Sequence, residues 1–144
     1  MSEQSVVRKG LESLLVWEKA MRLATRIYKE VVPSLPKEEK WAMAVQLRRA
    51  AASVPANIAE GYGHFYYQEG VRFCYIARGS LEEVRTFLAL AKELNYLDGS
   101  LHTSLSEDIQ ELRKILGGYV AYLKKNKPGK HEPGSKLSTK EDSE

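Results

Sequence analysis

The sequence has a single cysteine, Cys74, so an intramolecular disulfide is excluded. Cys74 lies within a helical pattern, which favours a small buried apolar residue over a reactive thiol. No apolar run approaches the roughly 20 residues needed to cross a bilayer, and the amino-terminal residues lack the apolar core of a signal peptide. We therefore expect no membrane partner and a cytoplasmic location.

The sequence also lacks the residue constellations that catalysis or metal binding would need. The histidines, His64, His102 and His131, lie on separate segments with no second ligand at metal spacing. No glycine-rich phosphate loop follows a strand, and Cys74 has no evident base. These absences predict a protein that is not an enzyme, with no catalytic residue, no metal site and no cofactor.

Excess charge is small as well, because the formal net charge is only +3 over 144 residues. This length fits one domain with a core of its own. Any binding to RNA or DNA must therefore come from where the cations are placed and not from their total number.

What the sequence does contain is helical periodicity, with apolar residues repeating by three and four along four segments. The pattern predicts an all-α fold, an antiparallel up-and-down four-helix bundle whose second helix is kinked. Ser104 and Glu107 have the spacing of a capping box for the fourth helix. We expect the helices at 13–31, 36–60, 64–95 and 104–125. The bundle domain then spans 13–127, between a flexible N-terminal arm at 1–12 and a disordered tail at 128–144 that has almost no apolar residue.

Two of these helices carry more apolar surface than a single bundle core needs. The first predicted core line is Leu14, Trp17, Met21, Ala24, Tyr28 and Val31, and a flanking line is Val16, Ala20, Leu23 and Ile27. The core line of the third helix is Phe73, Ile76, Ala77, Ser80, Val84, Phe87, Leu88, Ala91 and Leu94. Tyr75, Leu81 and Leu90 are left off it. Surplus apolar surface of this kind predicts a homo-oligomer.

The second helix combines an apolar line with a polar one and an internal proline. Pro55 removes a backbone hydrogen bond and predicts a kink near Ser53. The polar line is Gln46, Arg49, Ser53, Asn57 and Glu60. It has two interpretations. Arg49 and Glu60 could pair with Glu83 and Arg72 on the third helix while the short polar side chains satisfy the kink, or the line could form part of a ligand or subunit surface.

Cations gather in two places. Lys19, Arg22, Arg26 and Lys29 form a row along the first helix, and Lys124, Lys125 and Lys127 form a cluster near the carboxyl end. Both sets could be ordinary solvated surface. Alternatively, they could contact phosphates, and nearby aromatic residues could stack on unpaired bases; the candidates are Tyr66, Tyr67 and Tyr122.

Three motifs resemble a known family. They are L-x-V-W-x-K-A at 14–20, Q-L-R-R-A-x-x-S-x-P-x-N-I-A-E-G-Y-G at 46–63, and R-F-x-x-I-A-x-G-S-L at 72–81. This combination resembles the four-helix bundle proteins encoded in intervening sequences of bacterial 23S ribosomal RNA genes. Similar proteins include the accessory variability proteins of diversity-generating retroelements, which form pentamers and bind nucleic acid beside a reverse transcriptase. Arg78 departs from the family pattern, which usually has an apolar residue before Gly79 and Ser80.

Together these patterns predict a non-catalytic, oligomeric protein that binds RNA or DNA through basic helix faces, or that acts as a scaffold. The resemblance implies five subunits and a role as an accessory to a reverse transcriptase. The alternative is a purely structural or protein-interaction bundle that does not bind nucleic acid.

Overall fold

A computed structural model describes residues 10–64 and 66–128. A 3₁₀ helix at Gly10–Ser13 precedes four α-helices, which are α2 (Leu15–Arg26), α3 (Met43–Gly63), α4 (Tyr67–Glu93) and α5 (Gly99–Asn126). A π-helical turn, Ile27–Val31, continues α2, and short 3₁₀ helices at Val32–Ser34 and Lys37–Glu39 lead to α3. Most of the predicted N-terminal arm and nearly all of the predicted tail lie outside the described residues.

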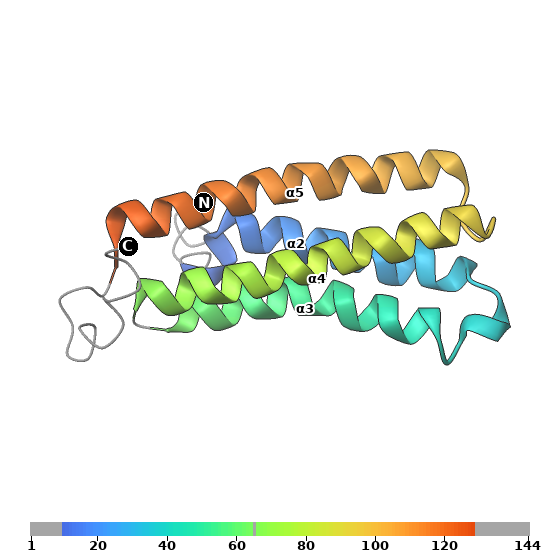
Figure 1. The fold of residues 1–144 in the computed structure, drawn as a ribbon, viewed down its shortest axis with the longest axis horizontal. Coiled ribbons are helices and arrows are strands. Elements are labelled where there is room, and N and C mark those ends of the chain that lie inside the picture. Colours follow the sequence, from blue (N-terminus) through green and yellow to red (C-terminus); the bar gives the residue numbers. More distant parts are fainter. Residues whose placement is uncertain (1–9, 65, 129–144) are drawn as a thin grey trace, which may run out of the picture.

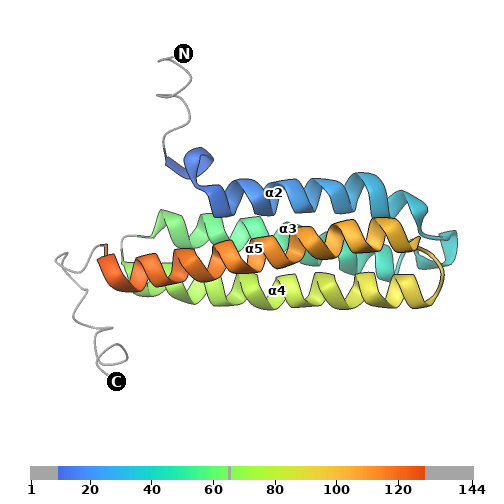
Figure 2. The ribbon, with the colours of Figure 1, turned by 90° about the horizontal axis from the view of Figure 1, so that it is seen from above.

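The four α-helices run antiparallel to their chain neighbours, as Figures 1 and 2 show. α2 packs against α3 and α5, and α4 packs against α3 and α5, so the bundle closes on itself. The described residues contain no strand, which confirms the predicted all-α, up-and-down four-helix fold. The start of α2 and the end of α5 lie at the same end of the bundle (Figure 1). No helix among the described residues is long and apolar enough to span a membrane.

The first helical segment contributes to the core the whole line predicted to flank it, together with Ala24 and Val31 from the predicted core line. Val16, Leu23 and Ile27 are almost completely buried, whereas Met21 and Tyr28 are 41% and 44% exposed. The two apolar lines lie side by side on the helix, and periodicity alone does not tell which of them faces the bundle. Much of the predicted core line therefore forms an apolar surface outside the core.

The core line of α4 also differs from the prediction. It consists of Cys74, Ala77, Leu81, Val84, Leu88 and Ala91, all of them buried. Leu81, predicted to lie off the core, has no exposed surface, while Ile76 and Leu94, predicted to lie in it, are 42% and 46% exposed. Ala77, Val84, Leu88 and Ala91 belong to both lines, so the buried face is only shifted toward the side of the helix that carries Cys74 and Leu81.

Helix boundaries differ from the prediction at two places. α3 begins at Met43 and not near Pro36, because the intervening residues form a 3₁₀ turn, where the Tyr96 hydroxyl donates a hydrogen bond to Glu39 at 3.1 Å. α5 begins at Gly99 and not at Ser104, because Asp98 caps it by accepting a hydrogen bond from the Leu101 N–H at 2.9 Å.

α3 continues as one α-helix through Pro55, so the predicted kink does not interrupt it. The Asn57 amide donates to the carbonyl oxygen of Ser53 at 2.8 Å and to its hydroxyl at 2.9 Å. The Ser53 hydroxyl is also 2.8 Å from the Ser80 hydroxyl on α4. Ser53 thus links Asn57 on its own helix to Ser80 on α4, where the two helices meet.

Gly61 allows a close approach where α3 and α4 cross. A Cβ atom on Gly61 would lie 3.0 Å from the Phe73 Cβ and 3.1 Å from the Gly70 Cα. Contacts this short are tighter than ordinary packing, so the neighbouring atoms, among them the Gly70 backbone, would have to move by a few tenths of an ångström. The E-G-Y-G end of the long motif therefore sets how closely α4 can turn back along α3.

Candidate functional site

The predicted basic row on α2 is largely occupied by acids of the same protomer. Arg26 Nη1 donates to Asp108 Oδ2 at 2.8 Å and to the Ser104 hydroxyl at 3.0 Å, and its Nε donates to Glu30 Oε2 at 2.7 Å. The hydrogen bonds that Arg26 donates to Glu30 and Asp108 raise the pKa of its guanidinium, and the bond to Arg26 lowers the pKa of Glu30. Ser104, predicted as a helix cap, thus helps to hold α5 against α2.

The other members of the row are engaged to different degrees. Lys19 Nζ lies 2.8 Å from Glu111 Oε1 on α5, and Arg22 lies 3.8 Å from Glu18. Lys29 is exposed. A phosphate at Lys19 or Arg26 would have to displace a carboxylate, so these two side chains serve first to join α2 to α5.

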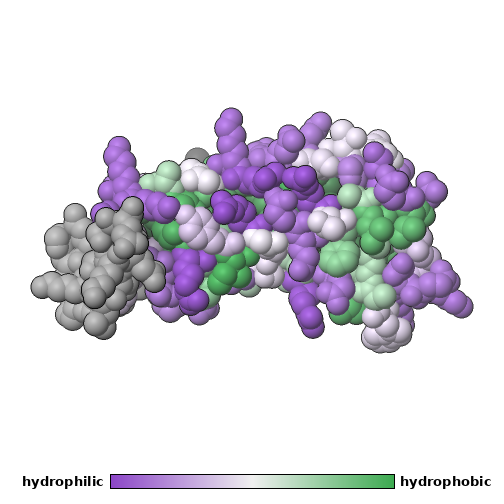
Figure 3. All heavy atoms as spheres, in the orientation of Figure 1, coloured by the Kyte–Doolittle hydropathy of each residue, from purple (hydrophilic) through white to green (hydrophobic). Residues whose placement is uncertain are grey.

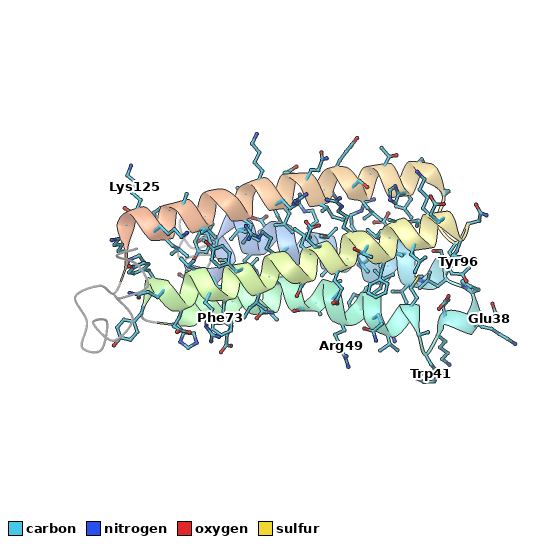
Figure 4. All side chains as sticks on the ribbon, in the orientation of Figure 1. Glu38, Trp41, Arg49, Phe73, Tyr96 and Lys125 are labelled. Atoms are coloured by element: carbon cyan, nitrogen blue, oxygen red, sulfur yellow. The ribbon has the colours of Figure 1, made fainter. Side chains whose placement is uncertain are left out.

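The polar line on α3 does not form the predicted ion pairs with α4. Glu60 Oε1 lies 3.6 Å from Nε2 of His64, the residue that follows α3. Arg72 Nη2 lies 3.3 Å from Oε2 of Glu69, which is on α4 as well. Within the described residues Arg49 has no ion pair, and Figure 4 shows its side chain pointing away from the bundle. Gln46 is exposed as well. The ends of the line are therefore surface, while its centre is the hydrogen-bonded group at Ser53 and Asn57.

An apolar groove of about 490 Å³ lies between α2 and α3. Its floor and walls are made by the apolar residues that α2 does not bury, together with small residues of α3. They are Leu11, Trp17, Met21, Ala24, Thr25, Tyr28, Lys29, Ala52, Pro55, Ala56 and Ala59. Pro55 is thus part of this surface. Figure 3 shows more apolar surface on a different face, near the end where α4 turns into α5.

A cluster of cations around an aromatic ring lies where the first half of α4 meets the last turns of α5. Lys124 Nζ donates to the Tyr75 hydroxyl at 2.8 Å and lies 5.5 Å from its ring centroid, and the Arg78 guanidinium lies 5.0 Å from the same centroid. We call Tyr75, Arg78 and Lys124 the Tyr75 cluster. The sequence from Leu112 to Asn126 contains no acidic residue, so this end of α5 supplies no carboxylate to neutralise it.

Other predicted site residues lie near the same end of α5. Lys125 is exposed and points away from the bundle (Figure 4), and Lys127 caps α5 in a left-handed conformation. Tyr122 is 56% exposed and stacks on Tyr119 with a centroid distance of 6.3 Å. Tyr67, predicted as a stacking residue, is buried and does not offer its ring to a base.

Sequence reasoning missed Tyr75 and Arg78 as site residues. Their spacing of three placed them together on one face of a helix, and Arg78 was recognised only as a departure from a family pattern. Their approach to Lys124, almost fifty residues further along the chain, depends on how α4 and α5 pair.

Two observations bear on the residues that sequence reasoning weighed for metal binding and thiol chemistry. No cluster of three or more histidine, cysteine, aspartate or glutamate side chains that could hold a metal ion occurs among them. Burial raises the pKa of the Cys74 thiol to about 11, so it stays protonated at neutral pH.

The fold and its surfaces define an antiparallel four-helix bundle with cations placed on its outside. Residues 12–118 match the 23S rRNA-intervening sequence protein family, and the chain belongs to that family. The family predicted from the motifs is thereby confirmed. The relation to retroelement accessory proteins still rests on the sequence motifs alone.

A solved structure supports the same assignment. The chain is similar to a protein with unknown function from the S23 ribosomal protein family of Bacteroides thetaiotaomicron, seen in a crystal structure at 1.70 Å resolution. The two chains are 25% identical with a TM-score of 0.67, over 74% of this chain and 98% of the other. Comparison with curated proteins finds no match.

Proposed function

We propose that this protein is a non-catalytic, oligomeric nucleic-acid-binding protein, and that the Tyr75 cluster with Lys125 forms its principal contact surface. The observation that carries the proposal is the convergence of two cations on one exposed tyrosine ring, at an end of α5 that has no acid. Proteins that hold single strands combine cations for the phosphates with aromatic rings for the bases.

This surface is better suited to phosphate than the α2 row. Lys19 and Arg26 already contact carboxylates at 2.7–2.8 Å, and replacing those contacts with phosphate contacts would cost much of what binding gains. Lys124 instead donates to a neutral phenol, which leaves its charge uncompensated. The α2 row therefore ranks second as a phosphate-binding surface.

Oligomer formation is proposed from the apolar groove between α2 and α3. The groove leaves the apolar side chains of Trp17, Met21 and Tyr28 uncovered by the rest of the protomer, and a second subunit seated there would bury them. Assembly into a ring, with five subunits as the family resemblance implies, would repeat the Tyr75 cluster around the assembly. Repetition of a weak site raises the overall affinity for a long strand without any new contact.

Fluorescence anisotropy with short single-stranded RNA, single-stranded DNA and duplex DNA tests the proposal. Removing three charges in Arg78→Gln/Lys124→Gln/Lys125→Gln should abolish most binding. A control with the same charge loss, Lys37→Gln/Lys40→Gln/Arg49→Gln, changes exposed residues on other surfaces and should bind nearly as the unchanged protein does.

The salt dependence gives a second readout. Three phosphate contacts to a single strand predict a log–log slope of about −2 per protomer, or a loss of roughly 20-fold between about 50 and 200 mM salt. Absence of binding at low salt to every probe would refute the proposal. Equal losses in the cluster variant and the control would show that only total charge matters.

The alternative is a scaffold that holds protein partners without binding nucleic acid, and the apolar groove favours it. A reverse transcriptase is the partner that the sequence motifs imply. Light scattering separates the roles of the two surfaces, because Met21→Glu should break the assembly, whereas the Tyr75 cluster variant should leave its mass unchanged.

A further inference from the structure

A second polar site lies on the same α4/α5 surface, nearer the α4–α5 turn. It is a pocket of about 270 Å³ between the two helices. Its lining contains two arginines, a histidine and two neutral polar side chains but no acid; the lining residues are Arg85, Ala89, His102, Ser106, Ile109, Gln110 and Arg113. Both arginines thus border one cavity, although they come from different helices.

The arginines approach the same carboxylate. Arg85 Nη1 lies 3.6 Å from Glu82 Oε2, and Arg113 Nε lies 3.1 Å from Glu82 Oε1. Two guanidinium charges therefore share one carboxylate charge, and the group carries a net charge of about +1 from these three residues. Glu82 Oε1 is buried without a hydrogen-bond partner, so its contact with Arg113 does not occupy a well-aligned donor. Most guanidinium N–H groups remain open to a ligand.

The donor set suits a phosphate group with two negative charges. Two arginine forks present paired N–H groups to phosphate oxygens, and Ser106, Gln110 and His102 add single donors around them. A phosphodiester inside a strand carries one charge, while a terminal phosphate carries close to two at neutral pH. The pocket's two arginines and one glutamate leave an excess of positive charge, which favours the doubly charged terminal phosphate over the singly charged phosphodiester.

The pocket also lies in line with the Tyr75 cluster. On α4, Tyr75, Arg78, Glu82 and Arg85 follow one another by steps of three and four, which places them on one stripe of the helix. Contacts across to α5 occur along that stripe, at Lys124 and at Arg113. Figures 1 and 2 both show α4 and α5 side by side over this length. Ten residues separate Tyr75 from Arg85, so the two sites are about 15 Å apart, the length of about four stacked nucleotides.

We propose that the Arg85/Arg113 pocket binds the terminal phosphate of a nucleic-acid strand whose first nucleotides lie along α4 and α5 toward the Tyr75 cluster. The inference rests on the proposed function. It adds recognition of a strand end, which the cluster alone would not provide. The same phosphate monoester chemistry occurs in a free mononucleotide, and the experiment separates the two sources.

The experiment compares four probes by anisotropy and competition. Three are forms of the same oligonucleotide, which carries a 5′-phosphate, a 3′-phosphate or hydroxyls at both ends. The fourth is AMP. We expect one phosphorylated end to bind at least about tenfold tighter than the hydroxyl form, a difference of about 1.4 kcal/mol. Arg85→Gln/Arg113→Gln should remove this preference, and Lys37→Gln/Arg49→Gln, with the same charge loss, should keep it. AMP should compete only weakly, because it lacks the nucleotides that reach the cluster.

A further variant tests the charge argument without removing an arginine. Glu82→Gln frees both guanidinium groups and should tighten binding of the phosphorylated oligonucleotide several-fold, while circular dichroism confirms the fold. No change or weaker binding in that variant would contradict the proposed role of the pocket.

The outcomes separate this inference from the proposed function. Equal binding of the phosphorylated and hydroxyl oligonucleotides would overturn the pocket inference and leave the Tyr75 cluster proposal standing. AMP competing as well as the oligonucleotide would reassign the pocket to free nucleotides and overturn the strand-end inference. If no oligonucleotide binds at low salt, both are refuted.

Discussion

Replacing Arg26 by alanine tests whether the α2 row is structural. The side chain is 22% exposed and makes hydrogen bonds of 2.7–3.0 Å to Glu30, Asp108 and Ser104. A hydrogen bond to a charged group contributes about 1.5–3 kcal/mol in a buried setting, and an exposed ion pair about 0.2–1 kcal/mol. For this partly exposed group we expect Arg26→Ala to lower the free energy of unfolding by about 1–2 kcal/mol.

The assay is urea denaturation followed by circular dichroism at a constant protein concentration, since assembly adds to apparent stability. Arg22→Ala is the matched control, because Arg22 lies 3.8 Å from Glu18 and is 60% exposed. Its loss should cost no more than about 0.5 kcal/mol. A double-mutant cycle of Arg26→Ala with Asp108→Ala should show a coupling of about 1 kcal/mol.

A clear result would refute this reasoning. If Arg26→Ala were no more destabilising than Arg22→Ala and the coupling to Asp108 were zero, the contact between α2 and α5 would contribute nothing. The guanidinium would then be as free for phosphate as the sequence first suggested. Loss of nucleic-acid binding in Arg26→Ala, without loss of stability, would return the α2 row to first place.

Three more predictions follow from burial and charge. Leu81→Ala should lower the free energy of unfolding, measured by urea denaturation, by about 2–5 kcal/mol, because Leu81 is fully buried. Leu90→Ala, at a 45% exposed position, should lower it by less than about 1 kcal/mol. Cys74 should react with a thiol reagent only as fast as the protein unfolds, because it is buried and its pKa is about 11; rapid labelling would contradict this. The hydrogen bond from Arg26 lowers the pKa of Glu30, so the stabilisation that this pair gives the folded state should be fully present above a pH of about 4.3 and should be lost as the pH falls through the lowered pKa. Glu30→Gln should flatten that part of a profile of unfolding free energy against pH. An unchanged profile would argue against the pair.

The number, order and direction of the helices followed from the sequence, because each of these properties is local. Apolar spacing by three and four marks a helix wherever it occurs, and the short connections force neighbouring helices to run antiparallel. The region around Pro33 and Pro36 ended one helix as expected, since proline disfavours a helix interior. The start of α5 was missed because Ser104 and Glu107 have the spacing of a capping box, whereas Asp98, another strong helix cap, begins the helix earlier.

Which side of a helix faces inward was not a local property. On α2 two apolar lines compete, and Val16 and Leu23 enter the core while Met21 stays outside. Their burial depends on where α3 and α5 come to lie, and the helix's own periodicity does not contain that information. The same limit applied to Leu81 on α4, which the pairing with α3 and α5 placed in the core.

For the candidate site, the sequence by itself determined the family, the absence of acids near the end of α5 and the positions of the cations along each helix. Only the tertiary structure decided which cations are neutralised and which are not. Arg26 meets Asp108 and Lys124 meets Tyr75 because α5 lies between α2 and α4. Charge interactions fall off within a few ångströms in water, so partners brought together by helix packing, and not neighbours in the chain, determine what each cation can bind.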